Sequence, residues 1–103
     1  MSLDNINSGT DGRRLVTTAG TPVQLVTTPT PCAGVFVNAE SDNTGVIAVG
    51  FSNAVRASLT NQNSGWVLGA RERVFIPVSD ASLLWLDTSA NGDGIGYSIV
   101  QRV

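Results

Sequence analysis

The sequence predicts an all-β fold, a single antiparallel β-sandwich that is jelly-roll-like and has about seven strands. From Pro22 onward the chain consists of short runs rich in Val, Ile, Leu and Phe, separated by turn-forming Gly, Asn, Asp and Pro. These runs recur at roughly 8–12-residue spacing, which is typical of sandwiches and barrels. No window has the hydrophobic period of an amphipathic helix. The chain is therefore expected to form one β domain.

The N-terminal segment differs from the rest of the chain. Residues 4–12 are polar and rich in turn-forming residues, and only Leu3 and Ile6 offer apolar anchors nearby. Such a segment buries too little apolar surface to become ordered on its own. We therefore expect an extended N-terminal arm over residues 1–20, serving as a tether onto a neighbour or fraying as a free end. The sandwich domain would occupy residues 21–103.

The strands follow from alternation and turn signals. The first is predicted at residues 22–26 and ends before Pro29, because proline cannot donate to a ladder. The next two, at 32–39 and 46–51, flank the turn at 42–45 and are predicted to pair as a hairpin. A polar loop is expected at 52–65. The remaining strands are predicted at residues 66–68, 71–78 and 82–87 and, after a turn at 91–94, from residue 95 to the end.

Two predicted strands, 46–51 and 83–86, are apolar on both faces, although a sandwich needs only one apolar face per sheet. The chain is also poor in charge, with 14% charged residues against the usual ~25%. The surplus apolar side chains must lie under a loop or against another subunit, and we expect a homo-oligomer, specifically a trimer. The candidate subunit-interface residues are Ile47, Val49, Phe51, Arg71, Arg73 and Trp85.

The residue types argue against catalysis. The chain has no His, and all six basic residues are Arg, so the usual neutral-pH proton shuttles and Schiff-base formers are missing. Asp87 and Asp93 flank a Gly-rich turn and are open to two interpretations, turn chemistry or calcium ligation. Cys32 opens an apolar run and is expected to be a buried structural thiol. We expect no enzyme activity, no cofactor and no metal.

The charge and hydropathy patterns limit the partners. A net charge of −2 argues against nucleic acid, which requires clustered cations. No apolar stretch approaches the ~20 residues of a membrane span. The N-terminus lacks the charged and apolar regions of a signal peptide. We therefore expect a protein that is made in the cytoplasm and binds neither nucleic acid nor membranes.

The order of several motifs resembles small virion proteins of tailed bacteriophages. The resemblance covers residues 22–100, and its motifs are core and turn signals. They are Cys32-Ala-Gly-Val-Phe-Val-Asn-Ala39, Asn43-Thr-Gly-Val-Ile-Ala-Val-Gly50, Arg73-Val-Phe-Ile-Pro-Val-Ser-Asp80, Ser82-Leu-Leu-Trp-Leu-Asp87 and Asn91-Gly-Asp-Gly-Ile-Gly-Tyr97.

At this length the chain is most similar to capsid decoration, or cement, proteins. The resemblance implies a β-sandwich, often trimeric, that binds the major capsid protein on the outer surface of the head, in a virion assembled in the host cytoplasm. It implies no catalytic residues. Leu3, Ile6, Arg13 and Arg14 are then the expected capsid contacts. The same sandwich also occurs in tail, fibre and head-attached proteins, so a receptor- or glycan-binding module that uses Trp66 and the loop at 52–65 is the alternative.

Overall fold

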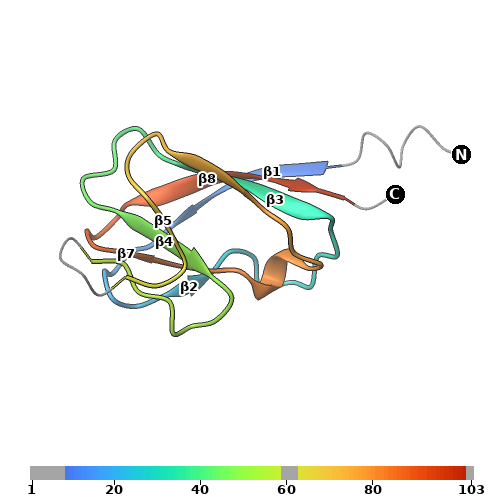
Figure 1. Cartoon of the computed structure of the whole chain (residues 1–103), viewed down its shortest axis with the longest axis horizontal. Helices are drawn as coiled ribbons and strands as arrows, with labels where there is room; N and C mark the ends of the chain where they lie inside the picture. The colour runs from blue at the N-terminus through green and yellow to red at the C-terminus, as the bar shows by residue number, and fades with distance from the viewer. Residues whose placement is uncertain (1–8, 59–62, 102–103) are drawn as a thin grey trace, which may run out of the picture.

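The computed structural model describes residues 9–58 and 63–101, and this part of the chain is all β apart from one 3₁₀ turn. Its strands form two four-stranded sheets, and all strand pairs are antiparallel. The two sheets form the layers of a sandwich (Figure 1). The predicted fold class, an antiparallel β-sandwich, is confirmed.

The two sheets are named here sheet I and sheet II. Sheet I contains, in spatial order, β1 (Gly9–Leu15), β8 (Gly94–Val100), β3 (Gly34–Ala39) and β6 (Arg73–Ile76). Sheet II contains β2 (Val23–Gln24), β7 (Trp85–Thr88), β4 (Ile47–Gly50) and β5 (Trp66–Leu68). The 3₁₀ turn η1 (Ala81–Leu83) precedes β7 and begins at Asp80, which caps it.

The strand pairing is nested, because β1 pairs with β8, β2 with β7, β3 with β6 and β4 with β5. This pattern is consistent with the jelly-roll-like connectivity expected from the sequence. The predicted hairpin between residues 32–39 and 46–51 is wrong, since β3 and β4 belong to different sheets. The turn between them is fixed to β8 instead: the Asp93 carboxylate accepts the amides of Thr44 and Gly45.

The boundary of the predicted arm also differs from the structure. Residues 9–15 form β1, which pairs with β8 from Gly9↔Val100 to Leu15↔Gly94, and Val16 is fully buried in the core. The sandwich therefore includes residues 9–16, which the prediction had assigned to the arm. Leu3 and Ile6 lie outside the described residues.

Composition did not predict β1 because this strand is held mainly by backbone pairing. Gly12 shows that its small residues have a packing role: a Cβ there would lie 2.3 Å from the hydroxyl oxygen of Tyr97. The aromatic side chain of Tyr97 thus occupies the space above a glycine in the neighbouring strand. A segment rich in turn-forming residues can therefore form a strand when the neighbouring strand supplies the large side chains.

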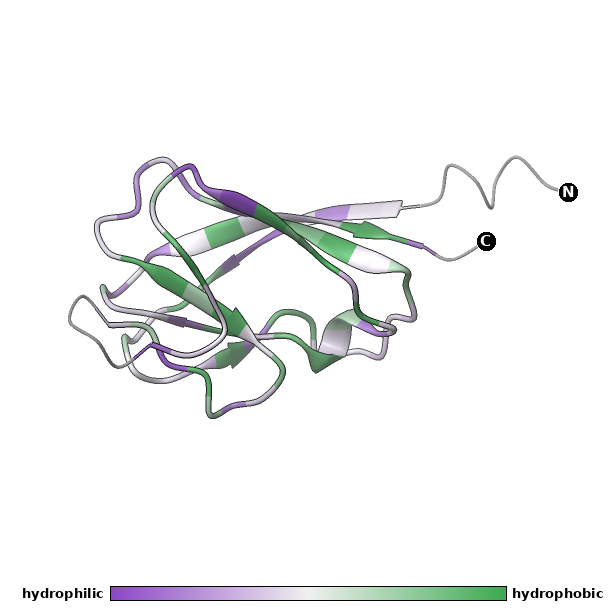
Figure 2. Cartoon of the chain, in the orientation of Figure 1, coloured by the Kyte–Doolittle hydropathy of each residue, from purple (hydrophilic) through white to green (hydrophobic). Residues whose placement is uncertain are grey.

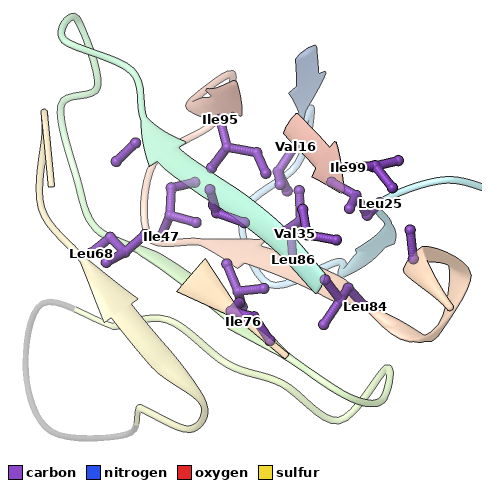
Figure 3. Close-up of a cluster of buried hydrophobic side chains, with 14 of the residues drawn as sticks. Val16, Leu25, Val35, Ile47, Leu68, Ile76, Leu84, Leu86, Ile95 and Ile99 are labelled. Carbon is purple, nitrogen blue, oxygen red and sulfur yellow. The ribbon is translucent and has the colours of Figure 1, made fainter. Parts of the chain in front are cut away.

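The core lies between the two sheets. Figure 3 shows the side chains that fill it, among them Val35, Ile47, Leu86 and Ile95 from four different strands, and all four are fully buried. Hydrophobic stretches run along β3, β4 and β8 (Figure 2). Burial of each such side chain stabilises the folded state by about 1.5–3 kcal/mol relative to leaving it exposed. Cys32 is buried as predicted.

Candidate functional site

The centre of the outer face of sheet II, at Asp87 and Ala48, is covered by the chain's own loops, whereas Val67 on the same face is 39% exposed. Asp87 on β7 is fully buried, and one carboxylate oxygen accepts the Gly20 amide at 2.9 Å while the other accepts the Ala57 amide at 2.9 Å. Two loops far apart in sequence are thereby fixed over the same strand. Ala48, which pairs with Asp87 across the sheet, is also fully buried. Loop cover thus accounts for strands that are apolar on both faces.

This cover corrects part of the predicted subunit interface. Ile47 and Val49 are fully buried members of the core, so the prediction that they form an intersubunit surface is wrong. They alternate with Ala48 and point between the sheets. Trp85 is partly exposed, and Phe51 is 56% exposed. Of the apolar residues predicted for an interface, only these two reach the surface.

The outer face of sheet I, in contrast, carries exposed aromatic side chains. Phe36 on β3 and Phe75 on β6 are directly opposite each other, with ring centroids 4.7 Å apart. They are 50% and 42% exposed. We name this surface the Phe36/Phe75 face. Its members are the outward residues of β3, β6 and β8, namely Phe36, Asn38, Arg73, Phe75, Gly96, Ser98 and Val100.

Gly34 makes the aromatic pair possible. A Cβ at Gly34 would lie 2.3 Å from Cζ of Phe75 and 2.9 Å from the carbonyl oxygen of Ile76. The Phe75 ring therefore lies across the glycine and beside Phe36. Small residues continue the face on β8, where Ser98 pairs with Phe36 and Gly96 pairs with Asn38. The aromatic pair is therefore the apolar centre of this face, next to the small residues of β8.

Polar and charged groups surround the aromatic pair. Arg73 is exposed and pairs with Asn38 across the sheet. On the other side, the Ser98 hydroxyl donates to the Asp11 carboxylate at 2.7 Å. An apolar centre with a polar rim is the usual anatomy of a protein–protein interface.

The predicted capsid contacts Arg13 and Arg14 both have partners within the chain. Both Nε and Nη2 of Arg13 donate to the Glu40 carboxylate, the latter at 3.0 Å. This hydrogen bond, with the attraction of the carboxylate charge, raises the pKa of Arg13 above its ordinary value. Arg14 Nε donates to the carbonyl oxygen of Gln24 at 2.9 Å and so links β1 to β2 in the other sheet. Arg13 remains exposed, whereas Arg14 is half-buried.

Arg71 has an unusual backbone conformation. Its φ is +70°, and it is the one non-glycine residue with positive φ in the described part of the chain. Its amide donates to the carbonyl oxygen of Ala39 at 3.1 Å, which fixes the turn before β6. Arg71 is exposed, as is Arg73 two residues later. A non-glycine residue in this region costs of order 1–3 kcal/mol.

The two aspartates considered as calcium ligands act as loop anchors. Asp87 binds two amides as described above. Asp93 is buried and accepts the amides of Thr44 at 3.0 Å and Gly45 at 2.7 Å. Within residues 9–58 and 63–101, no three acidic, Cys or His side chains cluster as metal ligands would. Both carboxylates therefore anchor loops that are distant in sequence, a role that neither of the two sequence interpretations gave.

An open groove lies where β4 ends and β5 begins. It has a volume of about 580 Å³ and is lined by Gly50, Phe51, Ser52, Ala54, Val55, Ser64, Gly65 and Trp66. The Phe51 and Trp66 rings meet edge to face, with centroids 5.4 Å apart and planes at 84°. We name this feature the Phe51/Trp66 groove.

Comparisons with protein-family models, with curated proteins and with solved structures found no match to this chain. Among the residues that the structure describes, no helix has the length and hydrophobicity to cross a membrane. The functional proposals below therefore depend on the geometry and on the pattern of the sequence.

Sequence reasoning missed the Phe36/Phe75 face, although a signal was present. Val35 and Val37 alternate with Phe36, and Val74 and Ile76 flank Phe75. Because successive side chains of a strand point to opposite faces, burying these aliphatic residues forces both aromatic rings outward. Alternation alone thus predicts the exposed pair once the aliphatic residues are assigned to the core.

Proposed function

We propose that this chain is a structural virion protein, a capsid decoration or cement protein that binds the outer capsid surface as a homo-oligomer. The observation that carries the proposal is the Phe36/Phe75 face, an apolar sheet surface that the chain's own loops leave exposed. Exposed apolar patches rimmed by polar residues mark protein–protein contacts. The resemblance of the sequence to small virion proteins supports the same role.

The Phe36/Phe75 face supports an oligomer because two aromatic rings form its centre. Interface energy is concentrated in a few buried aromatic or Arg residues, and here Arg73 lies beside Phe75 on the same strand. A trimer, the state expected from the resemblance, requires the face of one copy to meet a different surface of the next copy. Arg71 and Trp85 remain as candidates for that second surface.

The capsid contact would lie elsewhere on the molecule. The major capsid protein is the proposed partner, with Arg13 and the N-terminal residues Leu3 and Ile6 as candidate contacts. An oligomer multiplies weak contacts by avidity, so each copy needs only a modest affinity. Low charge suits this role, because salt screening then removes little of the binding energy. The proposed location is the capsid surface, with no nucleic acid, membrane or cofactor involved.

A binding assay on intact heads tests this proposal. The purified protein is sedimented with DNA-filled heads of the virus that encodes it. Saturable binding to heads, retained in Leu83→Ser and lost in the Phe36→Ser/Phe75→Ser double variant, is the expected result. Leu83 is 49% exposed on η1, so Leu83→Ser is a matched control that removes an exposed apolar side chain elsewhere on the surface. Failure of the wild-type protein to bind heads, or binding only to tails, would contradict the proposal.

The alternative is a fibre, spike or baseplate component that recognises a receptor or glycan. One observation favours it, the aromatic Phe51/Trp66 groove. Binding of the protein to heads would not by itself identify a ligand for this groove.

A further inference from the structure

We propose that the Phe51/Trp66 groove is a binding site for a neutral saccharide. This proposal does not depend on capsid binding, because the groove and the Phe36/Phe75 face belong to different sheets. The groove's volume of about 580 Å³ lies within the ~300–1,000 Å³ range of small-ligand sites.

The two aromatic rings give the groove its recognition surface. Phe51 follows β4 directly and is 56% exposed. Trp66 begins β5, pairs with Val49 and is packed partly against the core. Their rings meet edge to face, with planes at 84°, and both residues line the groove. The C–H groups of a sugar ring are weakly positive, and they pack against the negative face of an aromatic ring.

Two glycines and a valine form the other side of the groove. A Cβ at Gly50 would lie 3.0 Å from a methyl carbon of Val55, and a Cβ at Gly65 would lie 2.3 Å from the carbonyl oxygen of Val49. Gly65 also has a φ of +88°, a conformation that only glycine adopts readily. The two glycines therefore allow Val55 and the Val49 carbonyl group to pack closely against the backbone at the groove.

Two hydroxyl groups supply directional contacts. The Ser52 hydroxyl oxygen accepts the Ala54 amide at 3.2 Å, and the Ser64 hydroxyl oxygen accepts the Arg56 amide at 3.0 Å. In the hydrogen bonds of the described residues both hydroxyls act as acceptors. Each hydroxyl can still donate its own proton, and the hydroxyl oxygens of a sugar are suitable acceptors.

The charge of the groove selects the class of saccharide. None of the eight residues that line it in the described chain is charged. The nearby Arg56 guanidinium donates to the carbonyl oxygens of Asn53 and Val55. An acidic sugar would lose hydration at the groove without gaining a cation, which is unfavourable. The ligand is therefore uncharged.

The groove is held in place before any ligand arrives. Asp87 accepts the Ala57 amide, and Ser64 donates its backbone N–H to the carbonyl oxygen of Arg56 at 2.9 Å. These bonds fix the far end, at Arg56 and Ala57, of the loop that begins with Phe51 and Ser52. A preorganised site loses less conformational entropy on binding, which suits the modest contact area of a sugar.

The test is a glycan array followed by NMR titration with the neutral oligosaccharide that binds best. We expect the amide signals of Gly50, Ser64 and Gly65 and the indole signal of Trp66 to shift. Phe51→Ala is expected to weaken binding about tenfold, the loss of one aromatic contact. Leu83→Ser removes an exposed apolar side chain outside the groove and should leave the affinity unchanged. Folding of each variant is checked by the NMR spectrum of the unliganded protein.

Four results would overturn the proposal. The first is that the protein binds no neutral glycan, and the second is that Phe51→Ala binds with unchanged affinity. The third is that acidic glycans bind as tightly as neutral ones and that added salt abolishes this binding. The fourth is a shift of the groove signals with protein concentration in the absence of sugar, which would identify a second copy of the chain as the occupant.

Discussion

The ring of Phe75 lies across Gly34, so close that a Cβ at Gly34 would sit 2.3 Å from Cζ of the ring. Phe75 is on β6 and Gly34 is on the neighbouring strand β3. A glycine in a strand interior normally weakens the strand. Here it gives the Phe75 ring room beside Phe36, with the two ring planes at 53°, and the two rings form the centre of the proposed interface.

The first prediction concerns this glycine. Gly34→Ala should destabilise the fold by about 1–3 kcal/mol, because overpacking displaces the ring or the strand. The carbonyl oxygen of Ile76, 2.9 Å from the added carbon, cannot move without disturbing the sheet. Urea unfolding measures the change. Gly96→Ala on the same face is the matched control, since its Cβ would meet nothing closer than 3.9 Å, and equal losses in both variants would contradict the account.

The second prediction concerns the buried carboxylate of Asp87. Asp87→Asn keeps the shape of the side chain but replaces one acceptor oxygen with an NH₂ group, which cannot accept an amide. The loss of one buried hydrogen bond should cost about 1–3 kcal/mol. Amide hydrogen exchange at Gly20 and Ala57 should accelerate in the same variant. Asp42→Asn, at an exposed position, should change neither quantity, and unchanged exchange in Asp87→Asn would refute the anchoring role.

The third prediction concerns pH. The amide of Thr30 donates to the Asp80 carboxylate, and the Ser82 hydroxyl and amide do so as well. These bonds lower the pKa of Asp80 below its ordinary value of 3.8. A lowered pKa in the folded state means that the ionised carboxylate stabilises the fold above pH 3.8 and that this contribution is lost as pH falls through the lowered pKa.

The melting temperature of Asp80→Asn should therefore lie below that of the wild type at neutral pH, because the neutral amide is a weaker acceptor. The difference should shrink as the pH falls below 3.8, where the carboxylate of the unfolded chain takes up a proton, and should be lost once the pH has fallen through the lowered pKa of the folded state. Thermal unfolding from pH 7 to pH 2 measures this convergence. Curves that stay parallel throughout would show that the charge of Asp80 does not contribute.

The fourth prediction concerns the positive φ of Arg71. Arg71→Gly should stabilise the isolated chain by about 0.5–1 kcal/mol, because the relief of backbone strain exceeds the entropy that glycine adds to the unfolded state. If Arg71 is a subunit contact, the same variant should also dissociate more readily on dilution. Chemical unfolding and sedimentation measure the two effects separately. A less stable chain would mean that the turn does not strain Arg71.

Much of the architecture could be predicted from local patterns. The runs around Val35, Ile47 and Ile95 alternate or follow turn signals, so their assignment to strands needed no tertiary information. The pairing of strands was harder, because Asp93 and Asn43 direct the turn after β3 towards β8 rather than into a hairpin. Such side-chain-to-backbone contacts over 49 and 51 residues leave no local signature in the sequence.

The candidate surfaces were predicted less well than the strands. An apolar strand such as 46–51 looks the same in sequence whether a loop or a second subunit covers it. The loop cover depends on Asp87, whose carboxylate accepts the amides of Gly20 and Ala57. The sequence around Asp87 suggested only turn chemistry or calcium binding. The exposed Phe36 and Phe75 were predictable from alternation, but their proximity depends on the register of β3 and β6.

The native mass of the purified protein tests most directly the claim that the Phe36/Phe75 face is a subunit interface. One chain has a mass of 10.7 kDa. We predict that native mass spectrometry finds a trimer for the wild type and for Leu83→Ser, and a folded monomer for the Phe36→Ser/Phe75→Ser double variant. A monomeric wild type, or a double variant that still forms the trimer, would contradict the claim.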